Sequence, residues 1–587
     1  MIKKILCILL CAAMLLPMTA CNTNDPTNDL LESLTESMTG EPTTDPGTDP
    51  GTEPGTEPDT EPAPPVDEQP RPVAVIKDTL IYLFEGDSID LRYSTDANGV
   101  PNAKASDIVW TASTNCVSVQ KGKVTALKQG YAYVSGGGDT QCLIRIVPKD
   151  MPELVIDAGG VKIVRDENDP DKYYNCTISL TAASNPAFNL KDEVGGIRVR
   201  GNSTARAAKA PYRIKFASKL NLLGLNEGAE CKSWVLLSDP YDDSMIRNTT
   251  ALTLASTIID NYSADWRYVK LTLNGEYRGV YVLTEQSQVD ENRINIEEAG
   301  TDTTNVMSGY LFEMDGSPPH TTDKIRLSYE DMTITTFHGK LYNNPDIKYN
   351  TTDRGVKEID ISIKNDDLTV EQLAFARKYM TNLFRIIYEA TQENRYYEFD
   401  KNFDLVEVEN SDSQKTLSKI IDIDSLIRML IHSEIVSNGD QTKKSFYMWV
   451  DFSKDGNGLL TFGCPWDFDS AFCGYKSYSF QRIDYIFAAK RNPWYVMISR
   501  CMWFREEVCR VWDEVYEESN GFWNTSYVLD SIVKNYKDEI DGDAKLWKRT
   551  HDHEEYAVLT RDWVEEHIDW LNKHYDLEYA KSKWLNP

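Results

Sequence analysis

The fold of this chain is decided by two acidic stretches, SNGDQTKKSFY at residues 437–447 and FGCPWDFDSAFCG at residues 462–474. Both place aspartates among apolar and aromatic residues, and only a short gap separates them. Clustered carboxylates next to apolar strands are unfavourable unless a cation or a proton relieves their repulsion. The alternative is a pair of acidic surface turns that binds Ca²⁺ or no ligand at all.

The gap between the two stretches predicts a β-hairpin. Phe446–Val450 and Leu459–Phe462 have the composition of short strands, and Asp455–Gly458 is a strong turn signal between them. Such a hairpin brings the aspartates of the first stretch close to those of the second. This order matches one metal-assisted arrangement, in which a first Asp orients a hydroxyl nucleophile and a later Asp holds Mg²⁺ on a nucleotide.

The N-terminus predicts export. Lys3 and Lys4 precede an apolar run over residues 5–16, and the sequence LPMTAC ends at Cys21. This is a signal peptide that is too short to span a membrane, and the small residues before Cys21 resemble the bacterial lipobox. Residues 1–21 therefore predict an exported lipoprotein, anchored through a lipid on Cys21 at the extracellular face of the cell membrane. An ordinary secretory signal is the alternative.

The 587 residues have room for several domains, and a net charge of −30 argues against nucleic acid as a partner. Residues 22–71 are rich in Thr, Asp, Glu, Gly and Pro, so we expect a disordered stalk. Residues 72–148 change to short alternating strands, one of them at Ile108–Trp110, which predicts a small all-β sandwich. The sequences VWTAS at 109–113 and GKVTALKQG at 122–130 resemble the bacterial Ig-like group 2 family, whose members are usually spacers or weak adhesion modules.

Cysteine and histidine patterns give no zinc site. Of the 11 cysteines, two lie in the signal and Cys21 is the lipidation site, which leaves eight. An even number outside the cytoplasm permits disulfides, and Cys116–Cys142 is the most plausible pair. There is no CxxC pair, and the histidines of His551–Glu555 are two residues apart, so we expect this segment on the surface. From about Phe480 the chain is expected to be helical, with its aromatic residues in the core.

A larger α+β domain is expected over residues 151–580. Gly196–Thr204 predicts a strand that runs into a loop of small residues, and Tyr212–Phe216 predicts a second strand. A helix is predicted over Ser244–Ile259. An Asn-Gly turn between alternating runs predicts a hairpin over residues 268–285.

Several ordered motifs of this domain resemble the CotH kinase family. They are RVRGNST, KAPYRIKF, WVLLSDPYDDSMIRN, LNGEYRGVYVLTEQ, the NGD run and the PWDFD run. The resemblance spans roughly Pro152 to Leu577. It implies an atypical protein-kinase-like fold, secreted or surface-associated, that transfers phosphate from ATP with Mg²⁺ or Mn²⁺ as the metal.

The resemblance assigns nucleotide contacts to the first half of the domain. The loop residues Arg200, Gly201, Asn202 and Ser203 are expected to meet the phosphate oxygens, partly through backbone N–H groups. Lys215 is expected to contact the α- and β-phosphates and so to serve catalysis. Glu285 is expected either to pair with Lys215 or to lie near the adenine. A tight turn and a solvated strand lysine are the alternatives for the loop and for Lys215.

The acidic stretches supply the remaining roles. Asp440 is expected to orient or deprotonate the acceptor hydroxyl, and Asp467 and Asp469 are expected to bind the metal, without a ranking between them. Ser445 occupies the position, five residues after the catalytic Asp, where kinases have a metal-binding Asn. A hydroxyl is a weaker metal ligand than an amide carbonyl, and the neighbouring Lys444 either holds phosphate or repels the metal. A degenerate active site is therefore an open alternative.

Three functions follow from these expectations. The first is a surface-anchored atypical kinase that phosphorylates hydroxyl groups of extracellular or cell-surface protein, although ATP is scarce outside the cell. The second is a non-catalytic adhesion or scaffold lipoprotein with a degenerate kinase-like domain. The third is a glycosidase that uses Asp440 with Asp467 or Asp469, which would leave Lys215 and the small-residue loop without a role.

Overall fold

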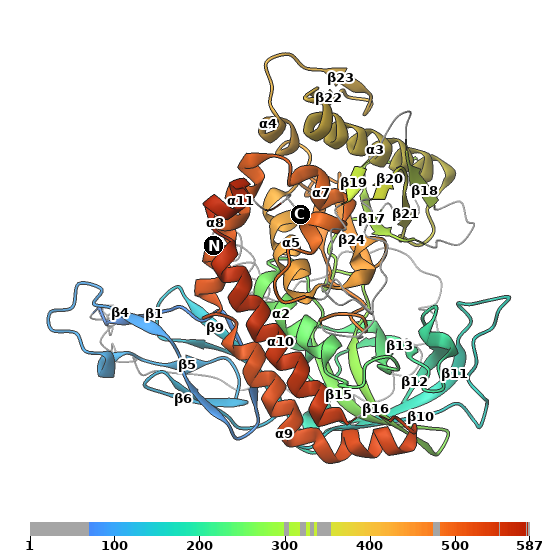
Figure 1. Cartoon of the computed structure of the whole chain (residues 1–587). Helices are drawn as coiled ribbons and strands as arrows, with labels where there is room; N and C mark the ends of the chain where they lie inside the picture. Colours follow the sequence, from blue (N-terminus) through green and yellow to red (C-terminus); the bar gives the residue numbers. More distant parts are fainter. Residues whose placement is uncertain are drawn as a thin grey trace, which may run out of the picture. The chain divides into compact units, whose positions relative to one another are not determined.

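The computed structural model describes residues 70–298, 304–316, 324–328, 334–336, 354–472, 482–550, 552–582 and 584. Residues 69–587 form one compact unit, with a sheet-rich N-terminal part and a helical C-terminal part (Figure 1). The predicted signal peptide, Cys21 and residues 22–69 of the predicted stalk lie outside the described residues. Within the described ranges, no helix is both long enough and apolar enough to cross a bilayer.

The first part of the described chain is a small β module, residues 70–147, with a core of its own. Its strands form three sheets, β2(Leu80–Phe84)–β9(Gln141–Val147)–β8(Gly130–Ser135)–β5(Thr111–Ala112), β3(Ser88–Asp90)–β7(Lys123–Ala126)–β6(Val117–Gln120) and β1(Val73–Ile76)–β4(Tyr93–Asp96). The strand expected at Ile108–Trp110 is wrong. A 3-10 turn occupies Ala105–Asp107, and the chain does not pair until Thr111.

The predicted disulfide between Cys116 and Cys142 is also wrong, because both thiols are free and buried. The Cys116 thiol is directed at the carbonyl oxygen of Gln129, and the Cys142 thiol is directed at that of Leu143, each at 3.7 Å. Burial raises the pKa of the Cys142 thiol well above its usual range. These side chains therefore act as small apolar groups of the module's core.

The second part is a closed seven-stranded barrel, and its interior is a separate apolar core. The strand order is β10(Glu153–Asp157)–β11(Tyr174–Thr181)–β12(Leu190–Val199)–β13(Tyr212–Leu220)–β14(Cys231–Leu237)–β16(Glu276–Glu285)–β15(Trp266–Leu273). The predicted hairpin is confirmed as β15 and β16. Its turn residues Asn274 and Gly275 both have positive φ, as a tight hairpin turn requires.

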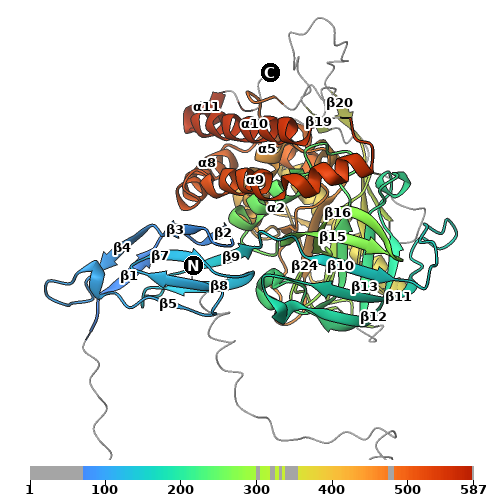
Figure 2. The ribbon, with the colours of Figure 1, turned by 90° about the horizontal axis from the view of Figure 1, so that it is seen from below.

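The third part is a five-stranded sheet surrounded by helices. The sheet order is β18(Lys324–Leu327)–β21(Ile359–Ile363)–β17(Gly309–Met314)–β24(Phe446–Asp451)–β25(Thr461–Gly463), and two further strand pairs are β19(Ile334–Thr336)–β20(Arg354–Val356) and β22(Tyr397–Phe399)–β23(Leu405–Glu407). The helices are α2(Arg247–Ile258), α3(Val370–Tyr388), α4(Ser413–Leu417), α5(Ile423–Val436), α6(Ala488–Arg491), α7(Pro493–Ile498), α8(Met502–Glu518), α9(Trp523–Leu546), α10(His553–His574) and α11(Leu577–Ser582). The views in Figure 1 and Figure 2 both place α9 beside α10 and α8 beside α11.

The hairpin between the acidic stretches is confirmed as β24 and β25, with Tyr447 opposite Gly463. The predicted helix over Ser244–Ile259 begins three residues later, at Arg247. The reason is the carboxylate of Asp242, which accepts the backbone N–H groups of both Ser244 and Arg247 at 2.9 Å and holds a turn before the helix.

The aromatic C-terminal region is helical, as predicted, and many of its large rings are buried, whereas Trp503, Tyr516, Trp547 and Trp570 are half-buried. Fully or nearly buried rings include Trp494, Phe504, Trp512, Phe522 and Trp563. The surface position expected for the His551–Glu555 segment is wrong for His553, whose side chain is buried at the start of α10. His551 itself lies outside the described residues.

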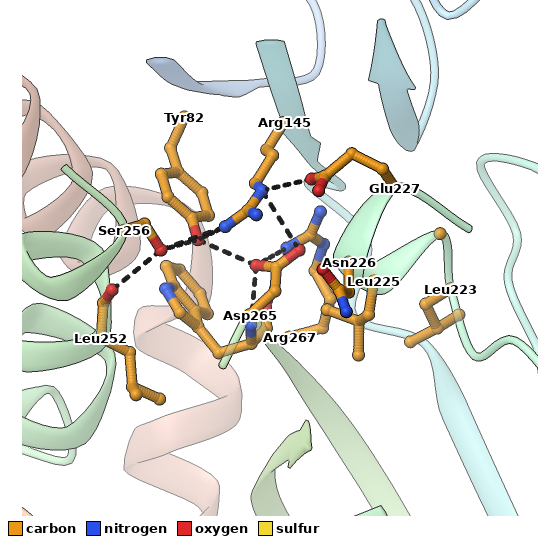
Figure 3. A network of polar contacts seen from close by, with 12 residues as sticks. Tyr82, Arg145, Leu223, Leu225, Asn226, Glu227, Leu252, Ser256, Asp265 and Arg267 are labelled. Carbon is orange, nitrogen blue, oxygen red and sulfur yellow. Dashed lines mark hydrogen bonds and ion pairs between the residues drawn. The ribbon is translucent and has the colours of Figure 1, made fainter. Parts of the chain in front are cut away.

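A buried polar network joins the β module to the barrel (Figure 3). The Tyr82 hydroxyl donates to Asp265 Oδ1 at 2.9 Å, and Arg145 donates to the same hydroxyl at 2.8 Å. The Nε of Arg145 lies 2.8 Å from Glu227, while Arg267 Nη1 lies 3.0 Å from Asp265. Strands β2 and β9 of the module supply Tyr82 and Arg145, so the network crosses from one sheet system to another. Separating the two parts would leave partners of this network unpaired, which favours the arrangement seen here.

Candidate functional site

The two acidic stretches meet in space. Asn438 donates its side-chain amide N–H to the carbonyl oxygen of Asp467 at 2.7 Å, and the Ser445 hydroxyl lies 3.2 Å from Asp467 Oδ2. A short 3-10 turn, Gly439–Thr442, presents Asp440 on the first stretch. Burial raises the pKa of Asp440 against the opposing charge of Lys444, and the negative charge of Asp467 adds to the rise. The two stretches therefore lie close together, as predicted.

Lys444 is the cation of this acidic cluster. Its ammonium group lies 2.9 Å from Asp440 Oδ2, four residues earlier. Burial by itself would lower the pKa of Lys444, but the carboxylates of Asp440, Asp467 and Asp469 raise it above its usual value. Lys444 therefore stays charged and partly neutralises the group.

The second stretch lies in surroundings that disfavour ionised carboxylates. Burial raises the pKa of Asp469 to about 8, and the charges of Asp467 and Asp239 contribute to the rise. Asp239, at the end of β14, has its own pKa raised to about 6 by burial and by Asp242. Carboxylates in this situation are stabilised by protonation or by a cation.

The oxygen atoms at this place fit a hard divalent cation, although they do not enclose one. Among the residues that the structure describes, no three His, Cys, Asp or Glu side chains stand close enough together to form a metal site. Asp467 and the Ser445 hydroxyl are in contact, and Asp469 is a buried carboxyl whose pKa is raised to about 8, so a bound cation would favour its ionised form. Carboxylate and hydroxyl oxygens are the donors that Mg²⁺ and Mn²⁺ prefer. These three residues are thus the ones that would hold the ion.

The small-residue loop of the barrel borders the same acidic stretch. The guanidinium of Arg200 lies over the ring of Trp466, 5.1 Å from its centre. Gly201 has a φ of 89°, and a Cβ there would meet the Thr204 hydroxyl, so this loop needs glycine. The Tyr241 hydroxyl donates to the carbonyl oxygen of Ser203 at 3.3 Å. The loop and the Asp467 stretch are therefore neighbours, as the resemblance implied, while Asn202 is exposed beside them.

The predicted pair of Lys215 and Glu285 is wrong. Lys215 stands opposite Ser233 on β14, whereas Glu285 stands opposite Trp234. Because consecutive residues of a strand point to opposite faces, the two side chains lie on opposite sides of the sheet. Lys215 is exposed, with no ion pair to another described residue.

Glu285 is instead a buried structural carboxylate. Its oxygens lie 3.5 Å from Arg293 Nε and 3.3 Å from the side-chain amide of Asn226, and they accept the backbone N–H of Asp265 at 3.1 Å. Burial raises the pKa of Glu285 to about 7, against the effect of Arg293. A side chain with no exposed surface cannot contact adenine in this arrangement.

One further basic residue of this barrel face, Arg213, was not predicted as a site residue. Arg213 lies opposite Arg198 in the β12–β13 pairing and on the same face as Lys215, and its guanidinium donates to Gln288 at 3.2 Å. Burial lowers the pKa of Arg213, and the charges of Arg198 and Arg200 lower it further. The signal was the alternation of RVRG and YRIK, which places these side chains on one face.

His432 is a second residue that sequence analysis did not select. It lies on α5, its Nε2 is 2.9 Å from the carbonyl oxygen of Ala251, and its ring packs edge-on against Phe468, with centroids 5.5 Å apart. Burial lowers the pKa of His432 to about 4. The ring is therefore neutral near pH 7 and supports the segment between Asp467 and Asp469 as an apolar group.

This property predicts an acid-sensitive contribution to stability. Unfolded histidine takes up a proton near pH 6.5, whereas folded His432 does so only near pH 4, so stability is lost as the pH falls between these values. We expect this residue to remove about 2 kcal/mol of unfolding free energy between pH 7 and pH 5. In chemical denaturation, the stability difference between wild type and His432→Gln should shrink by that amount. A difference that stays constant with pH would show that His432 takes up its proton at the same pH in the folded and unfolded states.

The fold and the site together define an α+β protein. A β barrel with basic residues on one outer face lies beside two aspartate-containing loops, and these loops belong to the five-stranded sheet and its surrounding helices. A protein-family model described as CotH kinase protein matches residues 197–580, more than half of the chain. The chain belongs to the CotH kinase protein family. No curated protein matches it. The match begins within β12, so β10 and β11 complete the barrel from outside the matched range.

Proposed function

We propose that this protein is an exported, lipid-anchored atypical kinase that transfers the γ-phosphate of ATP to hydroxyl groups of extracellular or cell-surface protein. Membership of the CotH kinase family supports phosphoryl transfer. The observation that carries the proposal is the contact of Ser445 with Asp467, which unites the two carboxylate loops beside Arg200. Phosphoryl transfer needs such a convergence of cations, metal-binding oxygens and a base.

Each residue then has a role. Asp440 orients the acceptor hydroxyl and accepts its proton, while Asp467, Asp469 and Ser445 would hold Mg²⁺ or Mn²⁺, whose charge offsets that of the phosphates. The loop of residues 200–203 contacts phosphate oxygens. Arg213 joins Lys215 as a candidate phosphate contact, because both lie on the strand face that borders this loop.

The proposal also includes where the protein is located in the cell. It is supported by the signal peptide pattern and the lipobox-like residues before Cys21, which would place the protein at the extracellular face of the membrane. The acceptor would then be a surface or secreted protein. The net charge of −30 supports a partner other than nucleic acid.

A second function, a surface adhesion or scaffold protein that binds without catalysis, is favoured by one observation. The described carboxylates do not form a closed metal site, and Ser445 is a weaker ligand than the Asn of kinases. If the metal were bound weakly, the protein would bind a nucleotide but transfer little phosphate from it.

Isotope transfer separates the two functions. Residues 70–587 are incubated with Mn²⁺ or Mg²⁺, exported proteins of a bacterial cell, and ATP labelled on either the γ- or the α-phosphate. The kinase proposal predicts that protein takes up label from the γ-position only. Transfer should be lost in Asp467→Ala/Asp469→Ala and kept in Asp455→Ala, a control in the exposed turn of the same hairpin. Nucleotide binding without transfer to any acceptor, or to the chain itself, would favour the scaffold function.

A further inference from the structure

The backbone of the segment Asp467–Asp469 is held by side chains from elsewhere in the chain. The N–H of Phe468 donates to Asn248 Oδ1 at 3.0 Å, and Arg247 donates to the carbonyl oxygen of Asp469 at 2.9 Å. Both Arg247 and Asn248 lie at the start of α2, more than 200 residues earlier in the sequence. Together with the amide of Asn438 described above, each of the three residues is tied to an outside side chain.

These ties accompany an uncommon backbone conformation. Asp467 has a φ of 67°, in the left-handed region. A residue with a Cβ is disfavoured there by about 1–2 kcal/mol, and such residues persist only where the surroundings fix them. The direction of the Asp467 carboxylate therefore depends on the groups that hold its neighbours.

Asn248 is itself fixed in orientation. Its side-chain N–H donates to Asp239 Oδ1 at 2.7 Å, which leaves its oxygen for Phe468. The carbonyl oxygen of Asp239 in turn accepts from Arg549 at 2.8 Å, beyond the end of α9. Asn248 and Asp239 are 1% and 2% exposed. Because they are buried, neither side chain is available to contact a nucleotide directly.

We propose that Asn248 is a positioning residue that holds Asp467 and Asp469 in the geometry that binds the metal, and that Asp239 fixes the orientation of its amide. The inference rests on the proposed function, since it concerns the same metal. Residues that orient metal ligands through hydrogen bonds typically change metal affinity about 10–100-fold when they are replaced. Asn248 acts on the segment through the backbone N–H of Phe468 and through a side-chain hydrogen bond to the carboxylate of Asp469, and it does not itself bind the metal.

A swap of the two side chains tests this inference. Asn248→Asp keeps the acceptor for Phe468 but replaces the amide that contacts Asp239 and Asp469 with another carboxylate. The double variant Asp239→Asn/Asn248→Asp restores one donor and one acceptor with the partners exchanged and the same total charge. Affinity for Mn²⁺ alone is measured by the electron paramagnetic resonance signal of the free ion. We expect the single variant to bind Mn²⁺ at least about tenfold more weakly and the double variant to return to within about threefold of wild type.

Each other outcome has a distinct meaning. Mn²⁺ affinity that is unchanged in Asn248→Asp, or not restored in the folded double variant, would overturn the positioning role while leaving the proposed function intact. Wild type that binds no Mn²⁺ would contradict the proposed function and with it the inference. If circular dichroism shows Asn248→Asp to be unfolded, Asn248→Ser removes both hydrogen bonds without adding charge. That variant should also bind Mn²⁺ more weakly, and wild-type affinity in it would overturn the role.

Discussion

Replacing Asp440 with Asn is expected to lower the rate of phosphate transfer about 10²–10⁴-fold, because the base that receives the hydroxyl proton is lost. The affinity for ATP with Mg²⁺ should stay within about threefold of wild type, since the metal is assigned to other residues. Asn has the size of Asp, so the turn Gly439–Thr442 keeps its shape. Single-turnover transfer and calorimetric binding on the same preparation separate the two quantities.

The matched control is Asp455→Asn, which removes a carboxylate from the exposed turn of the adjoining hairpin and should leave both quantities unchanged. If Asp440→Asn instead lost nucleotide affinity to the same extent as transfer, Asp440 would be a metal ligand rather than the orienting base. The ion pair with Lys444 makes this distinction important, because freeing that ammonium group changes the local charge as well.

Asp265→Ala should destabilise residues 70–587 by about 3–5 kcal/mol, because it removes the shared partner of buried charges. Asp265 is fully buried and accepts from the Tyr82 hydroxyl, while Arg145 and Arg267 lie 3.7 Å and 3.0 Å from its oxygens. Without this carboxylate, Arg267 would be left buried without its partner. Urea or guanidinium denaturation gives the change in unfolding free energy.

The comparison for this prediction is Asp90→Ala, an exposed carboxylate of β3, which should change stability by less than about 0.5 kcal/mol. A loss below about 1 kcal/mol in Asp265→Ala would show that the network of Figure 3 does not join the β module to the barrel. The rings of Tyr82 and Trp266 also stack across this junction, with centroids 5.6 Å apart. For this reason the experiments use residues 70–587 rather than a protein that begins at Met151.

Local patterns predicted the elements that depend on neighbouring residues. The DGNG turn between two apolar runs was enough for the β24–β25 hairpin, and the Asn-Gly turn was enough for β15–β16. The strand predicted at Tyr212–Phe216 is present as part of β13. These features follow from turn chemistry and from the two-residue period of a strand, and both depend only on residues that are close in the sequence.

Contacts between distant strands could not be predicted in the same way. Whether Lys215 and Glu285 share a face depends on the pairing of β14 with both β13 and β16, and that register shows no local signal. The prediction of a disulfide between Cys116 and Cys142 was wrong for a similar reason, because an even number of cysteines does not show which of them lie close together. The role of Asn248 depends on Phe468, which lies 220 residues further along the chain.

The central claim is that Asp467 and Asp469 hold a metal that binds a nucleotide. Calorimetric titration of ATP into residues 70–587, with and without Mg²⁺ or Mn²⁺, tests it most directly. The claim predicts binding that needs the metal, is lost in Asp467→Ala/Asp469→Ala and is kept in Asp455→Ala. Absence of binding with either metal, or binding that the double variant retains, would contradict it.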